Sequence, residues 1–144
     1  MSDYHIPVLL SQCIESLKIR PDGAYVDATF GAGGHSKTIL KNISANGHLY
    51  AFDMDDDAWD NAPADSNFTL IQSNYKFIDK FMRLYQVEAL DGILADLGIS
   101  SHQIDVPERG FSFRFDAPLD MRMNQSNPLD ARMLLNEYSE EDLQ

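Results

Sequence analysis

The sequence predicts an α/β fold in which helices cover both faces of a parallel sheet. From residue 8 to residue 96, short apolar runs alternate with segments of helical periodicity, as expected of a doubly wound sheet. A glycine-rich turn follows the first apolar run, as in folds that bind nucleotides beyond their first strand. The run 91–96 is apolar enough at its centre to be buried on both faces of such a sheet.

The first half of this alternation contains two helices and two strands. Apolar residues recur at helical spacing over 8–18, which predicts an amphipathic helix. A strand is expected at 24–30, and a helix over 36–43 follows the glycine turn. Asn46-Gly47 then forms a turn that leads into a second strand at 48–53.

The second half repeats the pattern with shorter segments. Residues 56–61 are expected to form a short helix that Pro63 ends. A third strand is expected at 68–72 and a helix at 77–85, where aromatic and leucine side chains share one face. The fourth strand, 91–96, completes a partial parallel sheet of about four strands with flanking helices.

The character of the chain changes after Asp96. Residues 97–127 are rich in Phe, Arg, Pro and Gly and show no sustained period, which is typical of a long functional loop region. Within it, three phenylalanines alternate with polar residues over 111–115 and predict a short strand or ribbon. A helix is expected at 131–135, and 139–142 resembles the start of another.

The sequence stops where that last helix would begin, and the run 93–95 would leave an exposed apolar sheet edge. Both features predict that residues 1–144 are the N-terminal part of a longer protein.

Composition narrows the possible functions. No apolar run approaches the length of a membrane helix, and the single cysteine, Cys13, fits a reducing cytoplasm, so a cytoplasmic protein without a membrane partner is expected. The net charge of −12 disfavours a nucleic-acid surface over most of the chain. Arg109, Arg114 and Arg122 nearly balance the acids of their loop, so they either contact RNA phosphate or form internal ion pairs.

The glycine turn favours an enzyme with a nucleoside cofactor. Asp53 ends the second strand 19 residues after Gly34, where an acid can bind ribose hydroxyls. Ser36 occupies the position of the third glycine of the dinucleotide fingerprint, which is therefore incomplete. Asp27 would repel a pyrophosphate and attract the amino group of S-adenosylmethionine; alternatively, it only caps the turn.

Five motifs together resemble one family. These are His5–Leu10, Gly31–Ser36, Asp91–Ser101, Pro107–Asp116 and Leu119–Met123. The sequence is similar to the bacterial MraW-type methyltransferases, which transfer a methyl group from S-adenosylmethionine to N4 of a cytidine in 16S, small-subunit, ribosomal RNA. The resemblance implies a Rossmann-like class I methyltransferase fold, ribosomal RNA or the small ribosomal subunit as partner, and no metal site.

The resemblance also implies roles for particular residues. Gly33, Gly34 and His35 match the cofactor loop, Asp53 the acid that holds the ribose, and Tyr75 an aromatic position beside the adenine; Asp96 and Gln103 match further cofactor contacts. Without the resemblance, His35 could simply begin a helix, Asp53 cap a turn, Tyr75 pack in the core and Gln103 lie in a solvated loop. For catalysis, Asp96 is the candidate acceptor for the cytosine amine, with Ser100 helping to position the base.

Two other functions remain open at this point. One is a fragment of an NAD-dependent dehydrogenase, which uses a related glycine turn. The other is a stand-alone cofactor-binding or interaction module without activity, which could form a homodimer through the exposed edge strand.

Overall fold

The computed structural model describes residues 7–144, so His5 and Ile6 of the first motif lie outside the described residues. The chain divides into two compact units, Met1–Leu97 and Gly98–Gln144. Unit 1 contains, in order, α1 (Leu10–Leu17), β1 (Ala24–Asp27), α2 (Gly34–Leu40), β2 (His48–Asp53), the 3₁₀ helix η1 (Asp56–Asn61), β3 (Phe68–Gln72), η2 (Tyr75–Phe77), α3 (Ile78–Leu84) and β4 (Gly92–Leu94). Unit 2 contains α4 (Ser101–Asp105), η3 (Pro107–Arg109), α5 (Ala131–Glu137) and α6 (Glu140–Leu143).

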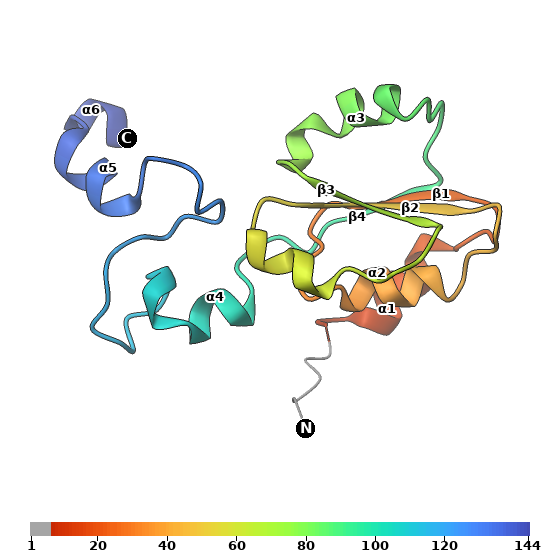
Figure 1. The fold of residues 1–144 in the computed structure, drawn as a ribbon, viewed down its shortest axis with the longest axis horizontal. Helices are drawn as coiled ribbons and strands as arrows, with labels where there is room; N and C mark the ends of the chain where they lie inside the picture. Colours follow the sequence, from red (N-terminus) through yellow and green to blue (C-terminus); the bar gives the residue numbers. More distant parts are fainter. Residues whose placement is uncertain (1–6) are drawn as a thin grey trace. The chain divides into compact units, whose positions relative to one another are not determined.

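The four strands form one parallel sheet in the order β3-β2-β1-β4, which confirms the predicted fold class (Figure 1). The chain first builds outward from β1 through β2 to β3. It then crosses over through α3 and adds β4 on the other side of β1. The order of strands therefore reverses between β1 and β4, and ligands of such sheets bind beyond the carboxyl ends of the strands at this point.

Helices cover both faces of the sheet, α1 and α2 on one and α3 on the other (Figure 1). Tyr25 and Leu49 point to the first face and pack with Ile39 of α2. The next residue of each of these two strands points to the opposite face. There Val26, Tyr50 and Phe52 pack with Met82 of α3, as expected of strands buried on both sides.

The observed strand bounds agree with the predicted bounds for β2 and β3 and differ for β1 and β4. Strands β2 and β3 have the predicted bounds. Strand β1 ends at Asp27 rather than residue 30, although the N–H groups of Ala28 and Phe30 still donate to the carbonyl oxygens of Leu94 and Phe52. Strand β4 is shorter than predicted, and Ile93 is 53% exposed on this edge of the sheet.

The helices of unit 1 also follow the predicted order. Residues 56–61 form a helix of the 3₁₀ type, and the segment expected at 77–85 begins as the 3₁₀ turn η2 before α3. Helix α2 begins at Gly34, two residues earlier than predicted, because Gly33 takes a positive φ of 74° at the N-cap.

Unit 2 corrects two expectations for the region 97–127. Residues 111–115 form no strand in the described chain, because no neighbouring segment offers them a backbone ladder. Conversely, the helix α4 and the turn η3 lie where no helical period was recognised. The helices expected near 131 and 140 are present as α5 and α6.

Candidate functional site

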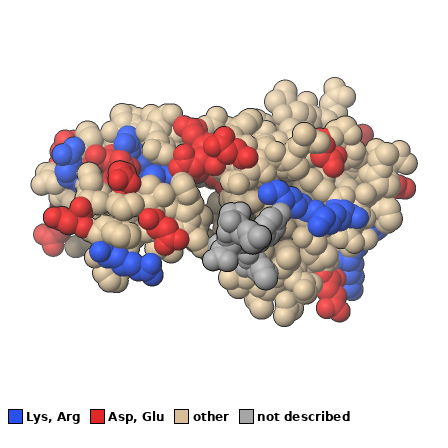
Figure 2. Space-filling view, turned by 60° about the horizontal axis from the view of Figure 1, so that its bottom comes forward, with Lys and Arg blue, Asp and Glu red and all other residues tan. Residues whose placement is uncertain are grey.

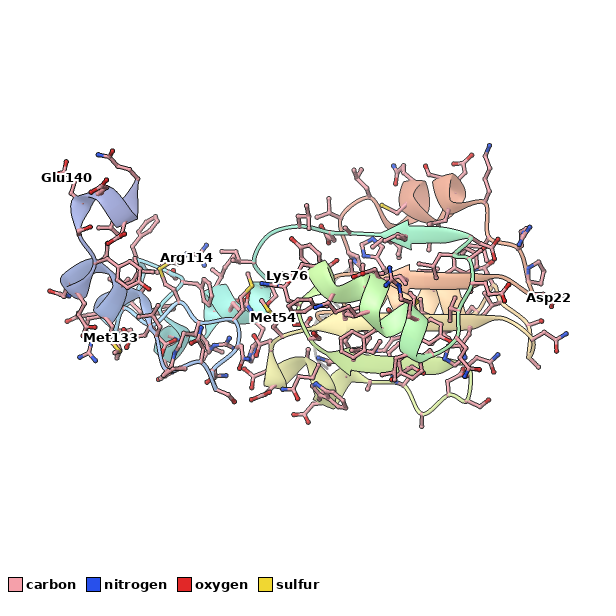
Figure 3. All side chains as sticks on the ribbon, turned by 90° about the horizontal axis from the view of Figure 1, so that it is seen from above. Asp22, Met54, Lys76, Arg114, Met133 and Glu140 are labelled. Carbon is pink, nitrogen blue, oxygen red and sulfur yellow. The ribbon has the colours of Figure 1, made fainter. Side chains whose placement is uncertain are left out.

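The candidate site lies where the carboxyl ends of the strands meet in unit 1. The glycine turn follows β1, Asp53 ends β2, and Asp96 comes two residues after β4. In Figure 3, Met54 and Lys76, which follow β2 and β3, lie at this end of unit 1, and Asp22, which precedes β1, lies at the opposite end. The topology thus brings together segments that are far apart in the sequence.

Asp53 ties the glycine turn to the end of β2. Its Oδ2 accepts the N–H of Gly31 at 2.8 Å, and its Oδ1 accepts the N–H of Asp55 at 2.9 Å. Each carboxylate oxygen has more than one lone pair, so both can accept a further hydrogen bond from a ligand. Asp53 therefore does cap the turn that follows β2, and its carboxylate oxygens can still accept hydrogen bonds from hydroxyl groups.

Asp27 does not face a ligand. Its side chain is fully buried, with Oδ2 accepting the hydroxyl of Ser36 at 2.6 Å and Oδ1 accepting the N–H of Thr29 at 3.1 Å. Burial raises the pKa of Asp27 above its ordinary value, and these two hydrogen bonds oppose that effect. The interpretation that Asp27 attracts the amino group of S-adenosylmethionine is therefore wrong; Asp27 holds the turn together from inside.

The three positions of the turn need glycine for different structural reasons. Gly31 has a φ of 52° with open space where a side chain would begin, and Gly33 has a φ of 74° with its position closed by the Phe30 ring. Gly34 lies against Pro7, which leaves no room for a Cβ. Of the three glycines in this turn, Gly31 therefore combines a left-handed backbone with a free approach for a ligand.

His35 is 5% exposed, and its Nε2 has no hydrogen-bond partner among the described residues. A buried polar atom without a partner is costly, so its environment is incomplete without a further group. His35 also lies within electrostatic range of Asp27.

Asp96 is fixed through its backbone and not through its side chain. Its N–H donates to Oγ1 of Thr29 at 2.7 Å. Over residues 7–144, its carboxylate makes no hydrogen bond or ion pair and is exposed. Sequence reasoning missed Thr29, although a threonine between the strand and the glycine turn was a visible signal.

Tyr75 begins η2, directly after β3, and is 44% exposed. The turn is fixed by Asn74, whose side chain accepts the N–H of Lys76 at 2.9 Å and donates to Sδ of Met54 at 3.3 Å. Tyr75 is therefore not a core residue, and its ring is accessible at the carboxyl end of β3.

A hollow of about 450 Å³ lies beside α3, lined by Ser73, Phe77, Lys80, Phe81 and Leu84. None of the predicted site residues lines it, so this hollow is separate from the glycine turn.

Ser100 and Gln103 are joined to each other in unit 2. The hydroxyl of Ser100 accepts the N–H of Gln103 at 3.1 Å, and Oε1 of Gln103 accepts the N–H of Ser100 at 3.0 Å. This reciprocal pair is a capping box that begins α4. Gln103 is buried, so the alternative of a solvated loop residue is wrong.

The three arginines have different environments. Arg109 is 4% exposed and donates to the carbonyl oxygen of Arg122 at 3.0 Å. Arg122 pairs with Asp120 at 2.6 Å, and this hydrogen-bonded pair lowers the pKa of the Asp120 carboxyl. Arg114 forms an ion pair with Asp105 at 3.7 Å, and its side chain is 67% exposed. Internal contacts thus hold all three arginines, and Arg114 has the most exposed side chain of the three.

The surface charge agrees with the acidic composition. On the face drawn in Figure 2, described Lys and Arg side chains form small separate groups among Asp and Glu. Residues 7–144 contain no cluster of His, Cys, Asp and Glu that could hold a metal ion. In the same part of the chain, no helix has the length and apolar character needed to cross a membrane.

Comparison with known proteins connects these features to one family. The profile of the MraW methylase family matches residues 2–144. A ribosomal RNA small subunit methyltransferase H from Flavobacterium johnsoniae is 60% identical over 141 residues. Proteins of the same description from Cytophaga hutchinsonii and Christiangramia forsetii are 57% and 53% identical.

These matches cover 97–99% of the chain but only 47% of each relative. The chain therefore spans about half the length of the curated relatives that it matches.

Proposed function

The chain belongs to the MraW methylase family, and from this membership we propose that it supplies the S-adenosylmethionine-binding part of a ribosomal RNA methyltransferase. The proposed reaction is methylation of a cytidine at N4 in small-subunit ribosomal RNA, in the cytoplasm. The observation that supports the proposal is the hydrogen bond from the N–H of Gly31 to the Asp53 carboxylate, which joins the acid at the end of β2 to an open glycine turn.

The residues present fit this cofactor. Ribose hydroxyls are donors, and both oxygens of Asp53 retain acceptor capacity. Nε2 of His35 is a buried polar atom that needs a partner, and Tyr75 offers an accessible ring for a flat base. Gly33 and Gly34 shape the turn, and Gly31 leaves space at its surface. When bound, S-adenosylmethionine supplies an electrophilic methyl group on a positively charged sulfur.

Asp96 is the proposed acceptor for the target amine. The lone pair of the cytosine N4 amine is delocalised into the ring, which makes it a weak nucleophile. A carboxylate that accepts a hydrogen bond from the amine localises that lone pair and can take the proton. The carboxylate of Asp96 has no partner within the described chain, so it is available for this role. The target base would have to leave its stack to reach it.

We propose that fewer residues of unit 2 contact the RNA than the sequence suggested. Gln103 and Ser100 order the start of α4 through their capping box. From the family match, Gln103 is proposed as a further cofactor contact and Ser100 as a residue that helps to position the base. Arg114 is the proposed phosphate contact among the three arginines. Because the chain is strongly acidic, most of the RNA-binding surface would belong to the part of the enzyme beyond these residues.

Calorimetric titration of this chain with S-adenosylmethionine, with NADH as the control ligand, tests the proposal. Saturable binding of S-adenosylmethionine alone is expected. Asp53→Asn should weaken it by about tenfold or more, because hydrogen bonds to a charged group are the stronger ones. Asp60→Asn removes the same charge from an exposed residue of η1 and should leave affinity unchanged.

Three results would contradict the proposal in different ways. Preferential binding of NADH would support the dehydrogenase alternative. Binding of neither ligand, with a stable dimer in sedimentation, would support the interaction module. A large loss of S-adenosylmethionine affinity in Asp96→Asn would assign Asp96 to the cofactor and not to the target amine.

A further inference from the structure

The backbone ladder between β1 and β4 ends just before the site. Its last bond runs from the N–H of Ala28 to the carbonyl oxygen of Leu94, at 2.8 Å. Because alternate residues of a strand point their backbone groups to the same side, the N–H of Asp96 also points toward β1. Strand β1 ends at Asp27, and the acceptor of this N–H is a side-chain oxygen and not a backbone carbonyl of β1.

The hydroxyl of Thr29 takes the place of that missing carbonyl. Its Oγ1 accepts the N–H of Asp96 at 2.7 Å, across 67 residues of sequence. The bond extends the pairing of the two strands by one step, at the point where the strand order reverses. A side chain therefore joins the glycine turn to the segment that carries the proposed acceptor.

Thr29 is itself held in place from the interior. Its N–H donates to Oδ1 of Asp27 at 3.1 Å, and Oδ2 of the same carboxylate accepts the hydroxyl of Ser36 in α2 at 2.6 Å. Threonine is also restricted at χ1, so its hydroxyl has few alternative directions. A continuous series of hydrogen bonds thus runs from Ser36 through Asp27 and Thr29 to Asp96.

We propose that Thr29 is a positioning residue, whose hydroxyl fixes the backbone of Asp96 beside the glycine turn so that the Asp96 carboxylate faces the reacting groups. This inference rests on the proposed function for the role of Asp96. The bond itself can be tested without any ligand.

The test compares Thr29→Val, which keeps the shape and removes the hydroxyl, with Thr29→Ser, which keeps the hydroxyl. Amide hydrogen exchange of Asp96 is followed by NMR in the 144-residue chain. Thr29→Val should accelerate exchange about fivefold to tenfold, as expected for the loss of one hydrogen bond, and Thr29→Ser should restore slow exchange. The matched control is Thr69→Val in β3, which removes a hydroxyl that lies 2.8 Å from Nε2 of His48 in β2 and should leave the Asp96 amide unchanged.

The second measurement is the affinity of the same variants for S-adenosylmethionine. Thr29→Val and Thr29→Ser should bind with about the same affinity, because the carboxylate that Thr29 positions is assigned to the target amine and not to the cofactor. Unchanged exchange of the Asp96 amide in Thr29→Val would overturn the proposal, whatever the affinity. Failure of the unaltered chain to bind the cofactor would instead overturn the proposed function, and amide exchange would still decide whether Thr29 positions Asp96.

Discussion

Replacing Asp27 with Asn should change how the stability of unit 1 depends on pH. The Asp27 side chain is fully buried, and burial is the largest influence raising its pKa above the ordinary value of 3.8. Hydrogen bonds from Ser36 and Thr29 and the nearby His35 oppose this effect, while Asp53 adds to it. The replacement keeps the shape and can still accept the N–H of Thr29, so it removes the ionisation with little change in packing.

The direction of the change follows from proton binding. A raised pKa means that the folded protein holds the Asp27 proton more tightly than the unfolded chain. The stability from this group is therefore fully present below about pH 4, the ordinary range for an aspartate, and decreases as pH rises toward the raised folded-state pKa. One proton can change the free energy of unfolding by at most about 1.4 kcal/mol per pH unit.

Urea unfolding between pH 4.5 and 8 measures this dependence. Trp59 is the only tryptophan and lies in η1, so its fluorescence reports on unit 1. The stability of the unaltered chain minus that of Asp27→Asn should fall as pH rises and then level off. Asp79→Asn, which removes an exposed carboxylate of α3, should show no such fall. A difference for Asp27→Asn that is flat or increases with pH would refute the burial argument.

Three further substitutions separate backbone strain from packing and test the start of α4. Gly33→Ala and Gly31→Ala should each cost about 1–2 kcal/mol of stability, because both positions have a positive φ. Gly33→Ala should destabilise the chain more, because its added Cβ would also collide with the Phe30 ring. Equal urea midpoints for the two variants would contradict this. Ser100→Ala should cost about 1 kcal/mol of local stability by breaking the capping box with Gln103. Faster amide exchange in α4, with an unchanged Trp59 transition, would support that expectation, and unchanged exchange would exclude it.

Local patterns in the sequence determined which segments form strands and helices and the order of these elements along the chain. The bounds of β2 and β3 were predictable because an apolar run between turn residues is read within a few neighbours. The acid at the end of the second strand was also visible, as a residue that can bind ribose hydroxyls, but its bond to Gly31 was not predicted. Family membership was visible in motifs that are distributed along most of the chain.

The capping box of α4 was missed although its signal was present. Ser100 and Gln103 have the spacing of the motif, but a helix of five residues is too short for a hydrophobic period to mark it. The alternating phenylalanines gave the opposite error, because they predicted a strand that is absent from the described chain. A period of two predicts a strand only where a neighbouring strand can pair with it.

By itself, the sequence determined the α/β fold, the glycine turn and the acids that follow the strands, because each depends on residues close together in the chain. Only the tertiary structure decided what these side chains face. Asp27 is buried and accepts hydrogen bonds from Ser36 and Thr29, and Arg109 is also buried. The hydroxyl of Thr29 accepts the N–H of Asp96, 67 residues away in the sequence. The physical reason is that a hydrogen-bond partner is set by which strand ends become neighbours, and strand order is not written in any local pattern.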